Sequence, residues 1–277
     1  MKADRIVVPG NGVKEDLEKY FELDHEKIEV VYNGYQKEAI QELSKEVMEE
    51  LQAGIFSAGN SIISIGRLTK QKGQWHLIRA FSELKRTVPG SKLIILGEGN
   101  LRDYLVQLSR DCGNEVYCVW NGEDERIESS DILFLGFQKN PFKYIKRSSL
   151  FALPSLWEGL PNIVMEALHC GVPVIASDCR AGPREVLAPE TDYRKEATTL
   201  EFAEYGILMP EFDGRFYSAR DPLTKAEKSW VDVLAMVLTD DALRERYRER
   251  SAVRALDFTL ERNRKQWLGV VDTVLKA

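Results

Sequence analysis

The chain has 277 residues, of which 44% are hydrophobic and 30% charged, and its formal net charge is −6. This composition is typical of a globular protein, and the negative charge argues against a general nucleic-acid binder. The four cysteines (Cys112, Cys118, Cys170 and Cys179) form no C-x-x-C pair, so we expect neither a zinc site nor a disulfide framework. Cysteines used in this way indicate a reducing, cytoplasmic location. No apolar run approaches about 18 residues, and residues 1–13 lack the apolar segment of a signal peptide.

The first 60 residues predict a small strand–helix–strand unit followed by a charged linker. We expect strands at 5–9 and 27–32 and a helix at 12–20, because the apolar triplet Ile6-Val7-Val8 is typical of a buried strand. Residues 35–60 are rich in charge and predict a linker that contains one helix, at 38–51.

From residue 61 onwards, strand and helix patterns alternate. Trp75, Ile78 and Phe81 have helical spacing after the first strand, and the strands are continuous apolar runs. This alternation predicts an α/β fold with a Rossmann-like, doubly wound parallel sheet. Residues 112–130 interrupt it, with a possible extra strand at 116–120 and a polar surface loop at 121–130, and residues 191–204 predict an exposed excursion. The expected strands are 61–65, 92–96, 131–137, a run ending at 151–154, 172–177 and 205–210, and the last helices are 225–239, 240–256 and 258–275.

The stretch 155–174 carries the strongest chemical signal. Pro161 is suited to the first position of a helix that ends before Gly171, so Glu158 falls in the preceding loop and Glu166 inside the helix. Between the two glutamates lie the free amides of Gly159, Leu160 and the first helical turn, including Asn162, which form a natural anion site. A nucleotide-sugar has the matching layout of sugar hydroxyls, diphosphate and ribose hydroxyls. The alternative is an ordinary βαβ unit with two unremarkable glutamates.

This stretch also carries a resemblance. The pattern E-x7-E from Glu158 to Glu166, followed by A-L-x-x-G-V-P-V-I, resembles the signature of retaining glycosyltransferases of the GT-B class, family 4 (glycosyl transferases group 1). The resemblance implies the C-terminal, donor-binding lobe of such an enzyme. Residues 1–34 would be the tail of the N-terminal lobe, 35–60 a linker and 61–257 the donor-binding domain. Residues 258–277 would form a helix that returns toward the first lobe and exposes apolar surface without it.

Two basic residues follow the first strand of the main domain, in the pattern G-R-L-x-x-x-K-G. Glutamates beside a diphosphate would repel it unless cations compensate, and Arg67 and Lys72 are the candidates. The resemblance implies that these two side chains, next to Gly66, grip the diphosphate of the donor. The alternative is surface charge on a loop.

The turn Gly97-Glu98-Gly99 lacks the third glycine of a dinucleotide fingerprint, so we interpret it as a tight turn that lines the cleft. The resemblance implies that backbone groups at Phe137 and Gln138 read the edge of the nucleobase. No Asp pair has D-x-D spacing, which favours a metal-free site without a cofactor.

Histidines are few, and the resemblance matches none of them to a catalytic group. We expect His25 and His76 to be exposed and His169 to be structural.

These signals predict the donor-binding domain of a retaining glycosyltransferase, weakly active or inactive as an isolated chain. The donor would be a nucleoside diphosphate sugar, by resemblance a UDP-sugar, and the acceptor a hydroxyl in polysaccharide or glycolipid synthesis. The expected partners are the first lobe and a lipid-linked acceptor at the inner face of the membrane. Two alternatives stay open: a non-catalytic nucleotide-sugar-binding subunit with a partner chain, and a nucleotide-sugar epimerase of the same architecture.

Overall fold

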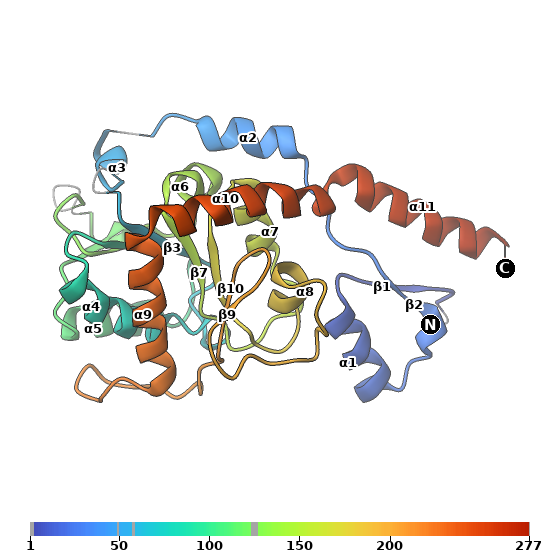
Figure 1. Ribbon diagram of the computed structural model, residues 1–277, viewed down its shortest axis with the longest axis horizontal. Coiled ribbons are helices and arrows are strands. Elements are labelled where there is room, and N and C mark those ends of the chain that lie inside the picture. The colour runs from blue at the N-terminus through green and yellow to red at the C-terminus, as the bar shows by residue number, and fades with distance from the viewer. Residues whose placement is uncertain (1–2, 49, 57–58, 123–126, 277) are drawn as a thin grey trace.

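The computed structural model describes residues 3–48, 50–56, 59–122 and 127–276 (Figure 1). Parts of the predicted linker and of the predicted surface loop at 121–130 lie outside the described residues.

The N-terminal unit consists of β1 (Ile6–Val8), α1 (Asn11–Phe21) and β2 (Ile28–Val30), and its two strands pair in parallel. The predicted strand–helix–strand order is therefore confirmed. Among its described residues, the linker contains two helices, α2 (Lys37–Lys45) and α3 (Glu50–Gly54), where one was expected. The first ends early because Glu46 leaves the helical region, with φ −51° and ψ 139°.

The main sheet has the strand order β5-β6-β4-β3-β7-β8-β10-β9 among the described residues, and all its pairs are parallel except β10 with β9. The doubly wound α/β fold is confirmed, and the predicted parallel sheet has one antiparallel pair, at this edge. Residues 191–204 are largely exposed, as expected, and contain the short strand β9 near their end. The strands are β3 (Ser61–Ile65), β4 (Lys92–Leu96), β5 (Val116–Cys118), β6 (Ile132–Phe134), β7 (Leu150–Leu153), β8 (Val174–Ser177), β9 (Glu201–Phe202) and β10 (Ile207–Met209).

Helices cover both faces of this sheet (Figure 1). They are α4 (Gln74–Thr87), α5 (Arg102–Asp111), α6 (Phe142–Arg147), α7 (Asn162–His169), α8 (Pro183–Leu187), α9 (Lys225–Thr239), α10 (Asp241–Ala255) and α11 (Leu260–Lys276).

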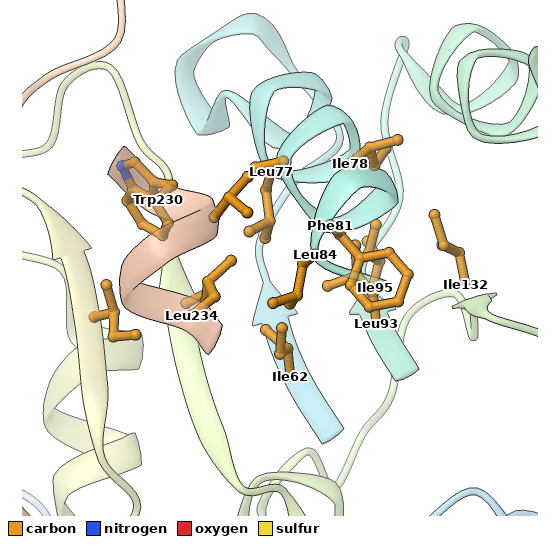
Figure 2. Close-up of a cluster of buried hydrophobic side chains, with 14 of the residues drawn as sticks. Ile62, Leu77, Ile78, Phe81, Leu84, Leu93, Ile95, Ile132, Trp230 and Leu234 are labelled. Carbon is orange, nitrogen blue, oxygen red and sulfur yellow. The ribbon is translucent and has the colours of Figure 1, made fainter. Parts of the chain in front are cut away.

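The core is divided by the sheet into two apolar clusters, because successive strand side chains point to opposite faces. Ile62 belongs to the cluster under α4, α5 and α9, whereas Ile63 belongs to the cluster under α6, α7 and α8. Figure 2 shows the first cluster, where Phe81 and Leu84 of α4 lie over β3 and β4 and Trp230 and Leu234 of α9 lie beside them. This packing fixes the strands whose ends carry the candidate site.

The last helices run across the sheet and then away from it. In Figure 1, α10 crosses over the strands and α11 extends beyond the main body, toward the side where the N-terminal unit lies. No residue of α11 is buried among those described, and Trp267, Leu268 and Val271 are about half exposed. The apolar surface expected here is therefore present. Within the described ranges, no helix combines the length and apolar character needed to cross a bilayer.

Candidate functional site

The candidate site lies at the carboxyl ends of the parallel strands, where open α/β sheets bind their ligands. Four loops contribute to it: the β3–α4 loop (residues 66–73), the β4–α5 loop (residues 97–101), the β7–α7 loop (residues 154–161) and the β6–α6 loop (residues 135–141). A further loop, the β8–α8 loop (residues 178–182), lies behind the β7–α7 loop. Because neighbouring parallel strands end at one edge, residues nearly a hundred positions apart in the sequence meet here.

Glu158 and Lys72 form an ion pair between the first and third of these loops. Lys72 Nζ donates to Glu158 Oε1 at 2.5 Å, and both side chains are largely buried. Ser155 Oγ donates to the same Glu158 oxygen at 2.6 Å, so two donors hold it. Within the described part of the chain, Glu158 Oε2 has no hydrogen-bond partner. The carboxylate is therefore fixed in orientation and keeps one oxygen available for a hydroxyl group.

Arg67 is exposed, unlike Lys72, and its guanidinium makes no hydrogen bond or ion pair among the described residues. Its backbone is nevertheless anchored, because Gln74 Nε2 donates to the Arg67 carbonyl at 3.1 Å. A fixed backbone with an unpaired guanidinium suits bidentate binding of an anion.

A cavity of about 360 Å³ opens beside Arg67, within the size range of small-molecule sites. It extends from the β3 and β4 ends to the first turns of α7. Its lining includes these predicted site residues: Gly66, Arg67, Gly97, Phe137, Gln138 and Glu166.

Glu166 contributes the only carboxylate that α7 presents to this cavity, and no other described group hydrogen-bonds with it. Burial raises the pKa of the Glu166 carboxyl above its ordinary value, because desolvation disfavours the charged form. A half-buried acceptor without an internal partner is suited to receive hydrogen bonds from a ligand.

The turn at Gly97 explains how the first two loops approach so closely. A Cβ at Gly97 would lie 2.1 Å from the carbonyl oxygen of Gly66, and the residue has a φ of +132°. Only glycine fits there without moving the backbone. Gly97 and Glu98 both border the cavity, and the interpretation of this turn as part of a donor cleft stays a prediction.

The loop before α7 differs in detail from the expectation. Pro161 precedes the helix, which begins at Asn162 and not at Pro161. The amides of Gly159 and Leu160 donate no hydrogen bond to any described residue, as an anion site requires. However, Gly159, Leu160 and Asn162 do not line the cavity next to Arg67, and the Asn162 side chain accepts a hydrogen bond from Asn33 Nδ2 at 2.6 Å.

Two residues near the predicted glutamates escaped the sequence reasoning. Ser155 orients Glu158, and its place three positions earlier was the available signal. Tyr35 lies close to Glu166, and its hydroxyl donates to the Asn162 carbonyl at 3.4 Å. Burial, and then the charge of Glu166, raise the pKa of the Tyr35 hydroxyl. No pattern in the sequence linked residue 35 to this helix.

The histidines are placed differently from one another. His25 is exposed, as predicted, but the same prediction for His76 is wrong, because its ring is fully buried and lies 2.9 Å from Glu227. His169 Nδ1 lies 2.8 Å from the Met165 carbonyl, which agrees with a structural part.

All four cysteines are free. The described residues contain no group of three His, Cys, Asp or Glu side chains arranged to hold a metal ion.

Comparison with known proteins shows the family to which the chain belongs. The family model for glycosyl transferases group 1 matches residues 47–194. An uncharacterised glycosyltransferase of Methanocaldococcus jannaschii is 39% identical over 96% of this chain and 62% of its own length. The N-acetylgalactosamine-N,N'-diacetylbacillosaminyl-diphospho-undecaprenol 4-alpha-N-acetylgalactosaminyltransferase of Campylobacter jejuni is 32% identical over 93% of this chain and 57% of its own length.

The fold is also that of solved members of the GT-B class. The Anabaena protein HepE, crystallised in complex with UDP, superposes with a TM-score of 0.70 at 18% identity, over 98% of this chain and 64% of that one. The chain thus spans less than two thirds of the length of these relatives. On the family match and the 39% identity, the chain belongs to the glycosyl transferases group 1 family, of the GT-B class.

Proposed function

We propose that this chain is the donor-binding domain of a retaining glycosyltransferase that moves a sugar from a UDP-sugar to an acceptor hydroxyl. The observation that carries the proposal is the arrangement at one sheet edge: a cavity between Arg67 and Glu166, next to the Lys72–Glu158 pair. We assign the donor-binding domain to residues 61–257, the linker to 35–60, residues 1–34 to the tail of the acceptor lobe and residues 258–277 to a helix that returns toward that lobe.

The nucleoside would occupy the cavity itself. Glu166 would accept hydrogen bonds from the two ribose hydroxyls, because its carboxylate has no internal partner. The base would lie toward Phe137 and Gln138. The Gln138 side chain is not free to bind it, because Gln138 Nε2 donates a hydrogen bond to the Leu135 carbonyl at 2.7 Å. That leaves backbone groups at this end to read the base edge.

The diphosphate would lie between the cavity and Glu158. Arg67 would bind it with its unpaired guanidinium, and the free amides of Gly159 and Leu160 would point at it from the other side. Lys72 would share its ammonium between Glu158 and the phosphate. These positive groups would stabilise the charge that develops on the departing diphosphate, without a requirement for a metal ion.

Glu158 would bind the sugar. Its Oε1 is held by Lys72 and Ser155, so Oε2 would accept a hydrogen bond from a sugar hydroxyl. In the retaining mechanism that the family resemblance implies, the leaving phosphate accepts the proton of the attacking hydroxyl on the same face of the sugar. The Campylobacter relative is named for transfer to a lipid-linked diphosphate, which supports a glycolipid acceptor here.

The acceptor would bind across the cleft from this domain, against an acceptor lobe that closes over the donor and excludes water. The exposed apolar side chains of α11 and the shorter length relative to the relatives support this arrangement. We therefore expect weak or no sugar transfer by these 277 residues alone.

Thermal unfolding with a panel of nucleotides tests the donor assignment. A ligand present at about 100 times its Kd stabilises the native state by about 2.7 kcal/mol, so UDP should raise Tm by several degrees. GDP and ADP at equal concentration should raise it less. If none of the three nucleotides shifts Tm, the proposed function is wrong, and if GDP or ADP gives the largest shift, the assignment of uridine is wrong.

A further inference from the structure

A buried carboxylate outside the proposed site receives four hydrogen bonds from the N-terminal unit. Glu185 of α8 is only 5% exposed. Its oxygens accept from the Asn11 amide at 2.8 Å, the Gly12 amide at 2.9 Å, Asn11 Nδ2 at 3.1 Å and the Tyr32 hydroxyl at 3.2 Å. The carboxylate thus occupies the anion position at the N-terminus of α1, where the helix dipole and two free amides favour negative charge.

The rest of α1 is complementary in charge to the main domain. Asp16 pairs with Arg180 of the β8–α8 loop, and Glu15 lies 3.6 Å from Arg194. These pairs are partly exposed and individually weak. Together they favour the orientation of α1 in which its N-terminal amides contact Glu185.

Close backbone contacts connect this interface with the proposed diphosphate site. Ala181 and Gly182 both have positive φ, +61° and +93°, so the β8–α8 loop is held in a conformation that an alanine rarely adopts. A Cβ on Gly12 would lie 2.5 Å from the Ala181 Cβ, and a Cβ on Gly182 would lie 2.4 Å from Pro161 Cδ. Helix α1 is therefore in close contact with the β8–α8 loop, and the β8–α8 loop is in close contact with the β7–α7 loop.

The N-terminal unit also contacts the β7–α7 region directly. A Cβ on Gly159 would lie 3.3 Å from Val13 Cγ2, and Asn33 Nδ2 donates to Asn162 Oδ1 at 2.6 Å. The loop that carries the amides proposed to bind the diphosphate is consequently in contact with both α1 and the β8–α8 loop.

We propose that Glu185 is a positioning residue for the donor site. By anchoring the N-terminus of α1, its carboxylate holds the β8–α8 and β7–α7 loops in the conformation that presents Glu158 and the free amides of Gly159 and Leu160. The inference rests on the proposed function, because it assigns a second role to residues around the same nucleotide site. Glu185 itself touches neither the cavity beside Arg67 nor the Lys72–Glu158 pair.

The experiment measures UDP affinity by titration calorimetry on the full chain, below the onset of unfolding of every variant, with Tm recorded in parallel. Glu185→Gln keeps the size of the side chain but removes its charge and turns an NH₂ group toward the amides. Gly12→Ala leaves Glu185 intact and wedges a methyl group against Ala181. Glu190→Gln, at an exposed residue just after α8, is the matched control.

We expect Glu185→Gln and Gly12→Ala to weaken UDP binding about three- to tenfold, and Glu190→Gln to leave it within about twofold. If Glu185 only stabilises the fold, both variants should have a lower Tm but the UDP Kd of the wild type. That result would overturn the inference and leave the proposed function intact. If Glu185→Gln does not fold, unchanged UDP affinity in Gly12→Ala has the same consequence. Absence of UDP binding by the unsubstituted chain overturns the proposed function, and the inference with it.

Discussion

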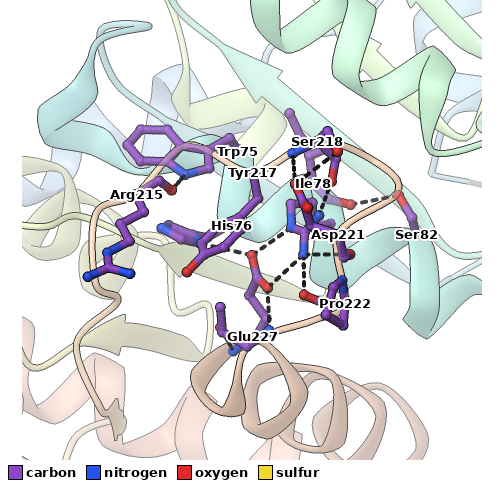
Figure 3. Close-up of polar contacts among 12 residues, drawn as sticks. Trp75, His76, Ile78, Ser82, Arg215, Tyr217, Ser218, Asp221, Pro222 and Glu227 are labelled. Carbon is purple, nitrogen blue, oxygen red and sulfur yellow. Dashed lines mark hydrogen bonds and ion pairs between the residues drawn. The ribbon is translucent and has the colours of Figure 1, made fainter.

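Two glutamates in this molecule, the buried Glu227 and the half-buried Glu166, have opposite environments. Glu227, at the start of α9, accepts hydrogen bonds from Arg79 Nε at 2.9 Å and from the Thr224 amide at 2.8 Å, and His76 Nδ1 lies 2.9 Å away (Figure 3). Glu166 lines the candidate cavity and has no described partner.

The pKa values of the two carboxyls follow from these environments. Burial raises the pKa of Glu227, but the hydrogen bonds from His76, Arg79 and the Thr224 amide outweigh burial and lower it to about 2. Burial alone acts on Glu166, so its pKa is raised. The first carboxylate has its charge satisfied within the fold, whereas the second keeps hydrogen-bonding capacity for a ligand. Burial by itself therefore does not indicate function, and the presence or absence of internal partners does.

The largest effect that separates the two is on stability. Glu227→Gln should lower the free energy of unfolding by about 3 kcal/mol at pH 7, because it leaves Arg79 buried without its counter-charge. Urea unfolding measures this loss. Glu83→Gln is the matched control, since the Glu83–Arg86 pair on the same α4 surface is exposed and should change stability by less than about 1 kcal/mol. Similar losses in both variants would contradict the structural part assigned to Glu227.

The pH dependence of this loss sharpens the assignment. The pKa of Glu227 is about 2 in the folded state against 4.5 for an ordinary glutamate, so the unfolded chain binds the proton more readily. The stabilisation is complete above pH 4.5 and is lost as the pH falls toward 2. The difference in unfolding free energy between wild type and Glu227→Gln should therefore shrink over that range. A difference that stays constant down to pH 2 would show that the charge of Glu227 is not its source.

A smaller effect of opposite sign is expected at Glu166. Because its pKa is raised, the folded state binds the proton more readily than the unfolded chain, and ionisation at neutral pH opposes folding. Glu166→Gln should raise Tm by about 1–3 °C at pH 7 and lose this advantage at pH 4, while UDP binding weakens. Differential scanning calorimetry at the two pH values measures the change. A lower Tm at pH 7 would show that the carboxylate supports the fold and is not reserved for a ligand.

Local patterns predicted most of the fold. The alternation of apolar strands with helical spacing located the parallel sheet and the three last helices within a few residues, since each signal lies within one element. The antiparallel strand β9 was missed because its two residues carry no period of their own and pair only through β10. The buried His76 was missed for a similar reason, because its partner Glu227 lies 151 residues further on.

The candidate site divides in the same way. Glu158, Glu166, Arg67 and Lys72 were predicted from motifs at strand ends, and the structure brings them to one edge. Tyr35 and Glu185 could not be predicted, because their contacts join the first 35 residues to helices more than a hundred residues away. Such contacts depend on how separate elements pack, which no local pattern records.

The central claim is that Arg67 and Glu166 bind opposite parts of one nucleotide, and calorimetric titration of UDP tests it most directly. Arg67→Ala and Glu166→Ala should each cost about 1.5–3 kcal/mol of UDP binding free energy, the usual range for hydrogen bonds to charged groups. Neither should lower Tm by more than a few degrees, since neither side chain has an internal partner in the described chain. UDP affinity equal to that of the wild type in both variants would contradict the account.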